Sequence, residues 1–103
     1  MNVQVLGFDW DTGNRRKCRK HGVVLSEIEA FFRQESVFVM PDIHHSQSEE
    51  RYIAYGPSPA KGQPMFVAFT IRIKEGETLI RPISARYMHE KEAREYEEKS
   101  SKI

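Results

Sequence analysis

The stretch "MFVAFTIRIKEGETLIRPISA" at residues 65–85 decides the fold, because it holds two apolar, β-branched runs joined by a short polar turn. Residues 65–74 are the longest strand-like run in the chain, and residues 79–85 form the predicted return strand. "KEGET" between them is typical of a hairpin connection. Pro82 cannot donate a ladder hydrogen bond, so the return strand should lie at a sheet edge or be bulged there.

Three more short strands and three helices are predicted around this hairpin. The strands are expected at residues 3–10, 37–40 and 51–56. The helices are expected from an Asp11 N-cap to a stop at Gly22, over 25–34 behind a Ser26–Glu29 capping box, and from a His89–Glu92 cap to the end of the chain, with about 99–103 frayed. The order β-α-α-β-β-β-β-α, with short turns between strands, predicts an α+β fold with a mainly antiparallel sheet.

Composition limits the class of protein. A chain of 103 residues and 12.0 kDa has room for one domain, 1–103, and too small a core for a large cofactor, so none is expected. No apolar run approaches the roughly 18 residues that cross a bilayer, and the N-terminus lacks a signal-peptide pattern, so we expect a cytoplasmic protein without a membrane partner. The single cysteine, Cys18, excludes an intrachain disulfide and a multi-cysteine zinc site.

A net charge of +1 does not by itself indicate a nucleic-acid partner, so the argument depends on where the charges lie. Arg72 and Arg81 fall near opposite ends of the two paired strands, and Arg86 follows just beyond the second. Guanidinium groups are permanently charged and bind phosphate through two parallel hydrogen bonds. The three arginines are therefore candidates for a phosphate clamp, although arginines are also common on any protein surface.

Histidines and Cys18 are the other candidates for chemistry. His21, beside Lys20 after a basic helix, is a candidate proton-transfer group, because imidazole titrates near neutrality; a structural role as a helix cap remains open. Cys18 lies among basic residues that would activate an exposed thiol, but it could equally face the core. "DIHHS" offers a weaker alternative, a metal site made by Asp42, His44 and His45, which needs a further ligand from elsewhere in the fold.

Several segments together resemble the BrnT toxins of bacterial type II toxin-antitoxin modules. They are "FDWDTGNRRKCRKHGV" near the start, "HSQSEERYIAYG" in the middle and "LIRPISARYMHEKEAREYEE" at the end, and the resemblance covers nearly the whole chain. The ordered set of F-D-W-D, K-H-G, S-E-E-R and I-S-A-R, followed by an acidic residue and a tyrosine, is specific. It implies a RelE-like fold, ribonuclease activity that halts translation, and a BrnA-type antitoxin whose complex with the toxin represses the operon.

The resemblance also implies roles for individual residues. Arg72 in "FTIR" and Arg86 in "ISAR" match functionally important arginines of the family, Arg81 matches a basic position of the same strand, and Lys20 and His21 match K-H-G. We therefore expect Arg72, Arg86 and His21 to be catalytic, with Glu50 as an alternative base. Lys20, Arg81 and Tyr87 are expected to contact RNA, and tyrosines near the sheet could stack on bases. No metal is needed. The rival prediction is a non-catalytic basic module that docks an antitoxin or nucleic acid.

Overall fold

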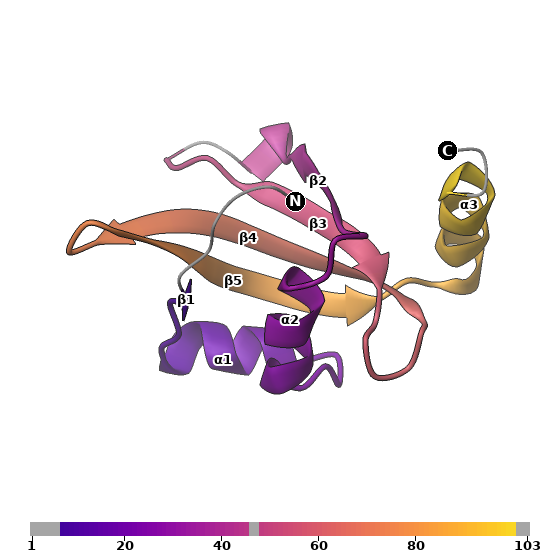
Figure 1. The fold of residues 1–103 in the computed structure, drawn as a ribbon, viewed down its shortest axis with the longest axis horizontal. Helices are drawn as coiled ribbons and strands as arrows, with labels where there is room; N and C mark the ends of the chain where they lie inside the picture. Colours follow the sequence, from indigo (N-terminus) through magenta and orange to yellow (C-terminus); the bar gives the residue numbers. More distant parts are fainter. Residues whose placement is uncertain (1–6, 46–47, 101–103) are drawn as a thin grey trace.

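The computed structural model describes residues 7–45 and 48–100. It contains five strands in one sheet of order β1-β5-β4-β3-β2, three helices and one short 3₁₀ turn (Figure 1). The elements are β1 (Gly7–Phe8), α1 (Thr12–Arg19), α2 (Leu25–Phe32), β2 (Phe38–Pro41), η1 (Ile43–His45), β3 (Tyr52–Pro57), β4 (Pro64–Lys74), β5 (Glu77–Tyr87) and α3 (Glu90–Ser100). The predicted α+β class and element order are confirmed.

Sheet pairing follows the predicted hairpins. β2 pairs with β3, β3 with β4 and β4 with β5, all antiparallel, whereas β1 pairs with β5 in parallel. The predicted first strand at 3–10 is present at Gly7–Phe8, and its residues 3–6 lie outside the described residues. Of the predicted frayed tail, Lys99 and Ser100 belong to α3, and residues 101–103 lie outside the described part of the chain.

Local sequence signals explain where the helices begin. The carboxylate of Asp11 accepts a hydrogen bond from the backbone N–H of Asn14 (3.0 Å), and the Asn14 side chain accepts one from the backbone of Asp11 (2.7 Å), so α1 starts with a capping box. Just beyond its C-terminal end, Gly22 has a φ of +85°, which glycine tolerates best. In α3, a carboxylate oxygen of Glu92 accepts from the backbone of His89 (2.9 Å), as the cap prediction requires.

The capping box predicted for α2 is wrong. α2 begins at Leu25 with Val24 as its N-cap, and no side chain caps it. The carboxylate of Glu29 is used elsewhere, because it accepts a hydrogen bond from the indole N–H of Trp10 (2.9 Å). A tertiary contact to the segment before α1 therefore replaces the local bond that the spacing suggested.

The hairpin of β4 and β5 is longer than predicted and carries a bulge. Its turn is made by Glu75 and Gly76, with φ of +52° and +78°, and β5 extends to Tyr87. Phe69 pairs with Pro82 and Ala68 with Ser84, so Ile83 is an extra residue in β5. Both predicted explanations apply to Pro82, because the bulge is observed there and the described pairing of β5 with β1 involves only Leu79 and Ile80.

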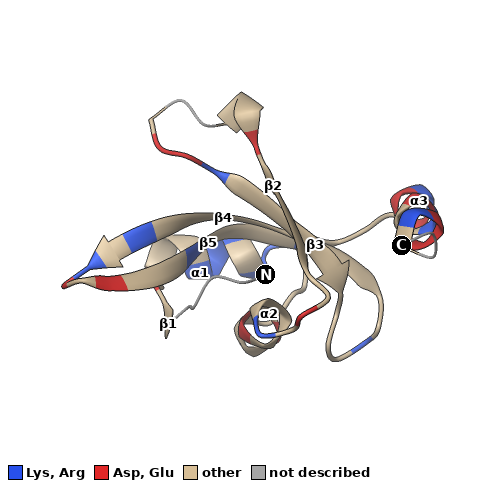
Figure 2. Cartoon of the chain, turned by 45° about the horizontal axis from the view of Figure 1, so that its top comes forward, with Lys and Arg blue, Asp and Glu red and all other residues tan. Residues whose placement is uncertain are grey.

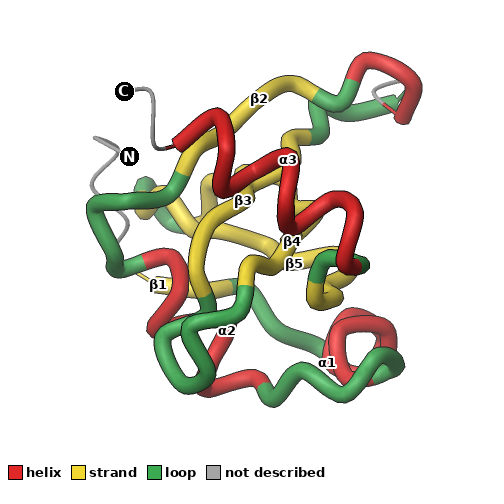
Figure 3. The backbone as a smooth tube through the Cα atoms, turned by 90° about the vertical axis from the view of Figure 1, so that its right-hand side faces the viewer, coloured by secondary structure: helices red, strands yellow, loops and turns green. Residues whose placement is uncertain are grey.

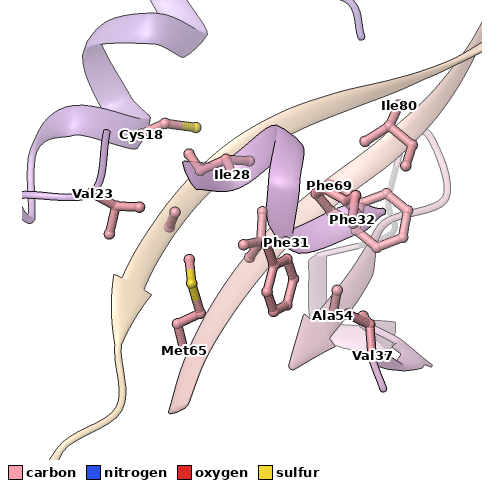
Figure 4. Close-up of a cluster of buried hydrophobic side chains, with 12 residues drawn as sticks. Cys18, Val23, Ile28, Phe31, Phe32, Val37, Ala54, Met65, Phe69 and Ile80 are labelled. Carbon is pink, nitrogen blue, oxygen red and sulfur yellow. The ribbon is translucent and has the colours of Figure 1, made fainter. Parts of the chain in front are cut away.

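Helix α2 covers one face of the sheet, which we call the inner face, and α1 lies along the β5 edge of the sheet, while α3 stands clear of both at the far end of β5 (Figures 1 and 3). Side chains from both helices and from β3, β4 and β5 meet there in a single apolar cluster (Figure 4). Its fully buried members include Cys18, Ile28, Phe31 and Met65. The opposite, outer face of the sheet carries the residues of interest for function.

Burial settles the position of Cys18. Its thiol lies within the apolar cluster, and desolvation raises its pKa to about 11. A neutral, inaccessible thiol is a poor nucleophile, so the alternative of an activated Cys18 is not supported.

No described helix is long and apolar enough to cross a bilayer.

Candidate functional site

The bulge in β5 places three polar side chains on the outer face. Side chains alternate along a strand, so Arg81 would ordinarily point away from the face that Ser84 and Arg86 share. The extra residue Ile83 shifts this alternation by one position. Arg81 now pairs with Thr70 and Arg86 with Phe66, two residues of β4 on the same face. Arg81 and Arg86 therefore lie on one surface, because of the irregularity at Pro82.

One cavity of about 450 Å³ surrounds Arg86, and we call it the Arg86 cavity. His21 and Ser84 lie in its wall, and its floor is apolar, made by Ile53, Phe66 and Ala68. The guanidinium of Arg86 lies over the Phe66 ring, 4.8 Å from its centroid. A permanent cation, an imidazole and a hydroxyl thus border one hollow.

The carboxylate of Glu92, from α3, closes this cavity on the side of Arg86. It accepts two parallel hydrogen bonds from the guanidinium, at 2.8 and 3.0 Å. These bonds to Arg86, and the bond from the backbone of His89, lower the pKa of Glu92 to about 2. Two parallel hydrogen bonds to a guanidinium are also the geometry in which arginine binds phosphate.

A second cavity, of about 540 Å³, lies between the start of α1 and the part of the β4–β5 hairpin that holds Arg72 and Arg81. We call it the Arg72 cavity. Arg72, Arg81 and Lys17 line it, together with Glu49 from the segment before β3. Arg72 Nη2 donates to Glu49 (3.3 Å). Arg72 Nε lies 3.2 Å from Glu49 but is not aligned with it, so this buried N–H has no hydrogen-bond partner among the described residues.

Two aspartates of the F-D-W-D segment hold Arg81. Its guanidinium lies 2.7 Å from Asp11 and 3.5 Å from Asp9, and Lys74 adds a contact of 2.9 Å to Asp9. The hydrogen bond from Lys74 lowers the pKa of Asp9, and the N–H of Asn14 and the guanidinium of Arg81 lower that of Asp11. Arg81 is thus more firmly fixed than Arg72, which has one acidic partner in the described chain.

Buried Asn14 connects the start of α1 to the bulge. Its side-chain amide donates to the backbone carbonyls of Asp9 and Pro82, both at 2.9 Å, while its oxygen accepts from Asp11. Because Pro82 lies in the bulge, this amide ties the position of the α1 start to the segment that orients Arg81 and Ser84. Asn14 also lines the Arg72 cavity.

The structure separates the predicted site residues into groups. Arg86 and His21 line the same cavity, whereas Arg72 and Arg81 line the other. Lys20 is exposed beside His21 and lines neither. The expected placement of Arg86 beyond the strand is corrected, because β5 continues through it. Arg72 lies near the C-terminal end of β4 and Arg81 near the N-terminal end of β5, so the antiparallel pairing brings the two close together. Charged residues of both signs mark this hairpin (Figure 2).

Tyr87 lies on the inner side of the sheet. It pairs with Met65 and packs against the core, and its hydroxyl donates to the buried carboxylate of Glu27 (2.7 Å), which also accepts from Ser58. Burial and the contact with Glu27 raise the pKa of Tyr87 to about 12. This placement favours a structural role over the predicted contact with RNA.

Asp42, His45 and Glu50 each have a hydrogen-bond partner within the protein. His45 Nδ1 lies 2.8 Å from Asp42, and the Glu50 carboxylate accepts from the Tyr52 hydroxyl (2.8 Å) while the Glu50 carbonyl accepts from Thr70. Within residues 7–45 and 48–100, no three histidine, cysteine or acidic side chains form a group that could hold a metal ion. Glu50 lines neither of the two cavities.

Sequence reasoning did not assign site roles to Asn14, Glu49, Ser84 and Glu92. Glu92 was expected only as a capping residue, a role that it does fill, and its second role depends on a contact across the end of the sheet. The S-E-E-R segment, already part of the resemblance, was the available signal for Glu49.

A comparison with the profiles of known protein families identifies the family of this chain. The profile of the family described as "Ribonuclease toxin, BrnT, of type II toxin-antitoxin system" matches residues 10–92. The chain belongs to the BrnT family. The match spans both cavities, from the start of α1 to Glu92. No curated protein matches the chain. The resemblance inferred from the ordered motifs is therefore confirmed, and a toxin of this type implies an antitoxin partner.

Proposed function

We propose that this BrnT protein is a metal-independent endoribonuclease that cleaves RNA and halts translation in the cytoplasm. A BrnA-type antitoxin binds it and, as a complex, represses the operon, so operator DNA is contacted only through the antitoxin. The observation that carries the enzymatic proposal is the shared cavity of Arg86 and His21. It combines a permanent cation with an imidazole, the side chain that most often serves as a general acid or base.

Cleavage requires three events at one phosphate. The 2′-hydroxyl loses a proton and attacks the phosphorus, charge builds up on the phosphoryl oxygens, and the 5′-oxygen leaves with a proton. Arg86 stabilises the charge that develops on the phosphoryl oxygens. His21 carries one of the two protons, and Ser84, which lines the same cavity, hydrogen-bonds the phosphate. Arg72, Arg81 and Lys20 add positive charge that attracts the RNA backbone.

The first experiment is induced expression of the wild type, Arg86→Gln and His21→Gln, with growth and the integrity of total RNA followed in parallel. Arrest with RNA breakdown in the wild type, lost in both variants, supports the proposal. The same RNA pattern with purified protein in a chelator supports metal independence. Exposed Arg94 on α3, which lines neither cavity, provides the control Arg94→Gln.

A non-catalytic binding module remains the second candidate, and one observation favours it. Arg72, Arg81 and Arg86 are each already paired with a carboxylate of the chain itself. A module that only docks a partner needs no titrating group, so binding would survive His21→Gln. Intact RNA and normal growth with folded wild-type protein would make this candidate the better one.

A further inference from the structure

Arg72 and Arg86 are too far apart to hold the same phosphate. Arg86 pairs with Phe66, which is six residues from Arg72 along β4. At about 3.3 Å per residue, the two Cα positions are roughly 20 Å apart. Their guanidinium groups also turn to different elements, Arg72 to Glu49 before β3 and Arg86 to Glu92 on α3. A joint clamp on one phosphate is therefore not what this geometry provides.

The two cavities are nevertheless neighbours on one surface. Ile83 lines the Arg72 cavity and the next residue, Ser84, lines the Arg86 cavity, so they meet at the bulge. Arg81 is closer to Arg86 than Arg72 is, since its partner Thr70 is four residues from Phe66, or roughly 13 Å. The two cavities thus adjoin at the bulge, with Arg81 between Arg72 and Arg86 along the hairpin.

Charge in the Arg72 cavity suits a second anion. Four basic side chains line it, against the acidic Asp11 and Glu49. Asp11 is engaged with Arg81 at 2.7 Å, whereas the contact of Glu49 with Arg72 leaves the Nε of that arginine without a hydrogen bond. A backbone phosphate in the place of the Glu49 carboxylate would present its two non-bridging oxygens to Arg72 and lie near exposed Lys17.

The floor of the Arg86 cavity suits an unpaired base. Ile53, Phe66 and Ala68 form an apolar floor, and the Arg86 guanidinium already lies over the Phe66 ring. Unpaired bases stack on aromatic rings and on arginine planes, whereas bases in a duplex are not available for such contacts.

We infer that one single-stranded RNA segment spans both cavities, with the cleaved phosphate at Arg86 and a second phosphate, more than one nucleotide away, at Arg72 and Lys17. This rests on the proposed ribonuclease function and adds the kind of substrate, an unpaired segment of several nucleotides. Contact with the Arg72 cavity makes the efficiency of cleavage depend on the length of the RNA substrate.

The test is cleavage of unpaired RNA oligonucleotides, from a dinucleotide to about eight nucleotides. For the wild type we expect kcat/KM to rise at least tenfold once the substrate reaches the Arg72 cavity. The double variant Arg72→Gln, Lys17→Gln should lose this dependence on length. Arg19→Gln, Arg94→Gln removes the same charge from exposed positions outside both cavities and should keep it. A wild type without length dependence, or an Arg72→Gln, Lys17→Gln variant that keeps it, would overturn the inference.

A binding series separates this inference from the proposed activity. The same oligonucleotides, made resistant by 2′-O-methylation, are titrated against each protein by fluorescence anisotropy at several salt concentrations. The logarithm of the association constant decreases linearly with the logarithm of the salt concentration. If the wild type binds longer RNA more tightly, this slope should become shallower in the Arg72→Gln, Lys17→Gln variant, by about 0.7 for each lost phosphate contact. Equal slopes overturn the inference even where RNA is cleaved, and absent cleavage with the expected slopes overturns the activity alone.

Discussion

The two faces of the sheet are built from the same strands but stabilised in opposite ways. On the inner face, apolar side chains from β3, β4 and β5 pack against α1 and α2. On the outer face, arginines of β4 and β5 stand over open cavities, each paired with a carboxylate from outside these strands. The inner face gains stability from the burial of apolar side chains. On the outer face, each arginine is held by a carboxylate of the protein, which an anionic ligand can replace. The difference separates the residues that maintain the fold from those that can bind an anion.

The largest effect should come from a cavity on the inner face. Phe31→Ala removes a fully buried ring that packs edge-on against Phe32 (centroids 5.4 Å apart). We expect the free energy of unfolding to fall by about 3–5 kcal/mol, measured by denaturant unfolding. Ile73→Ala, at a side chain 73% exposed, is the control and should change it by less than about 0.5 kcal/mol. Similar losses in both variants would contradict the distinction between buried and exposed apolar residues.

On the outer face, Arg86→Gln should affect chemistry more than folding. Loss of one charge-stabilising donor lowers kcat by about 10²- to 10³-fold in comparable sites. We expect that loss in RNA cleavage, with an unfolding midpoint much closer to the wild type than that of Phe31→Ala. A variant that cleaves RNA at the wild-type rate would remove Arg86 from the mechanism.

Removing the charge of Glu92 tests its pairing with Arg86 through an expected gain rather than a loss of RNA binding. Glu92→Gln keeps the shape of the side chain but removes the charge that competes with phosphate, so RNA affinity should increase about fivefold to tenfold. Glu95→Gln, an exposed change on the same helix outside the Arg86 cavity, is the matched control. If Glu92 instead transfers a proton, Glu92→Gln would reduce cleavage, and the role assigned to it would be wrong.

The pH dependence of this pair has a defined sign. The pKa of Glu92 is about 2 in the folded protein, below its ordinary value of 4.5, so the ion pair stabilises the fold above pH 4.5 and is lost as the pH falls through about 2. An NMR titration of the Glu92 carboxyl should show this low midpoint, and Arg86→Gln should move it towards 4.5.

The smallest effect is expected at Tyr87. Tyr87→Phe removes one of the two hydrogen bonds to the buried Glu27 carboxylate and should cost about 1 kcal/mol of stability. Thermal unfolding measures the loss, with Tyr96→Phe on α3 as the control. A fall in RNA affinity without a loss of stability would instead restore Tyr87 as an RNA contact.

Local patterns were sufficient for much of the fold. The 65–85 hairpin, the Asp11 cap and the Gly22 stop depend on short-range chemistry, and each is observed. The capping box of α2 failed because Glu29 bonds to Trp10 instead, a partner 19 residues away that no local spacing reveals.

The site was harder to predict because it depends on which way side chains point. Proline indicated that β5 was irregular at residue 82, but only the pairing register shows that the extra residue is Ile83 and that Arg81 therefore shares a face with Arg86. The roles of Glu49 and Glu92 depend on segments that approach from outside the hairpin. The S-E-E-R segment and the His89–Glu92 spacing draw attention to these two residues but do not show which arginine each one meets.

The burial of Cys18 offers a practical route to these questions. Because the only thiol of the chain is enclosed and its pKa is about 11, maleimide dyes should react slowly with the folded protein. A cysteine introduced at an exposed site on α3 would then be the one residue that takes up a fluorophore. A probe attached there would report, in real time, whether the C-terminal helix moves away from Arg86 when RNA arrives.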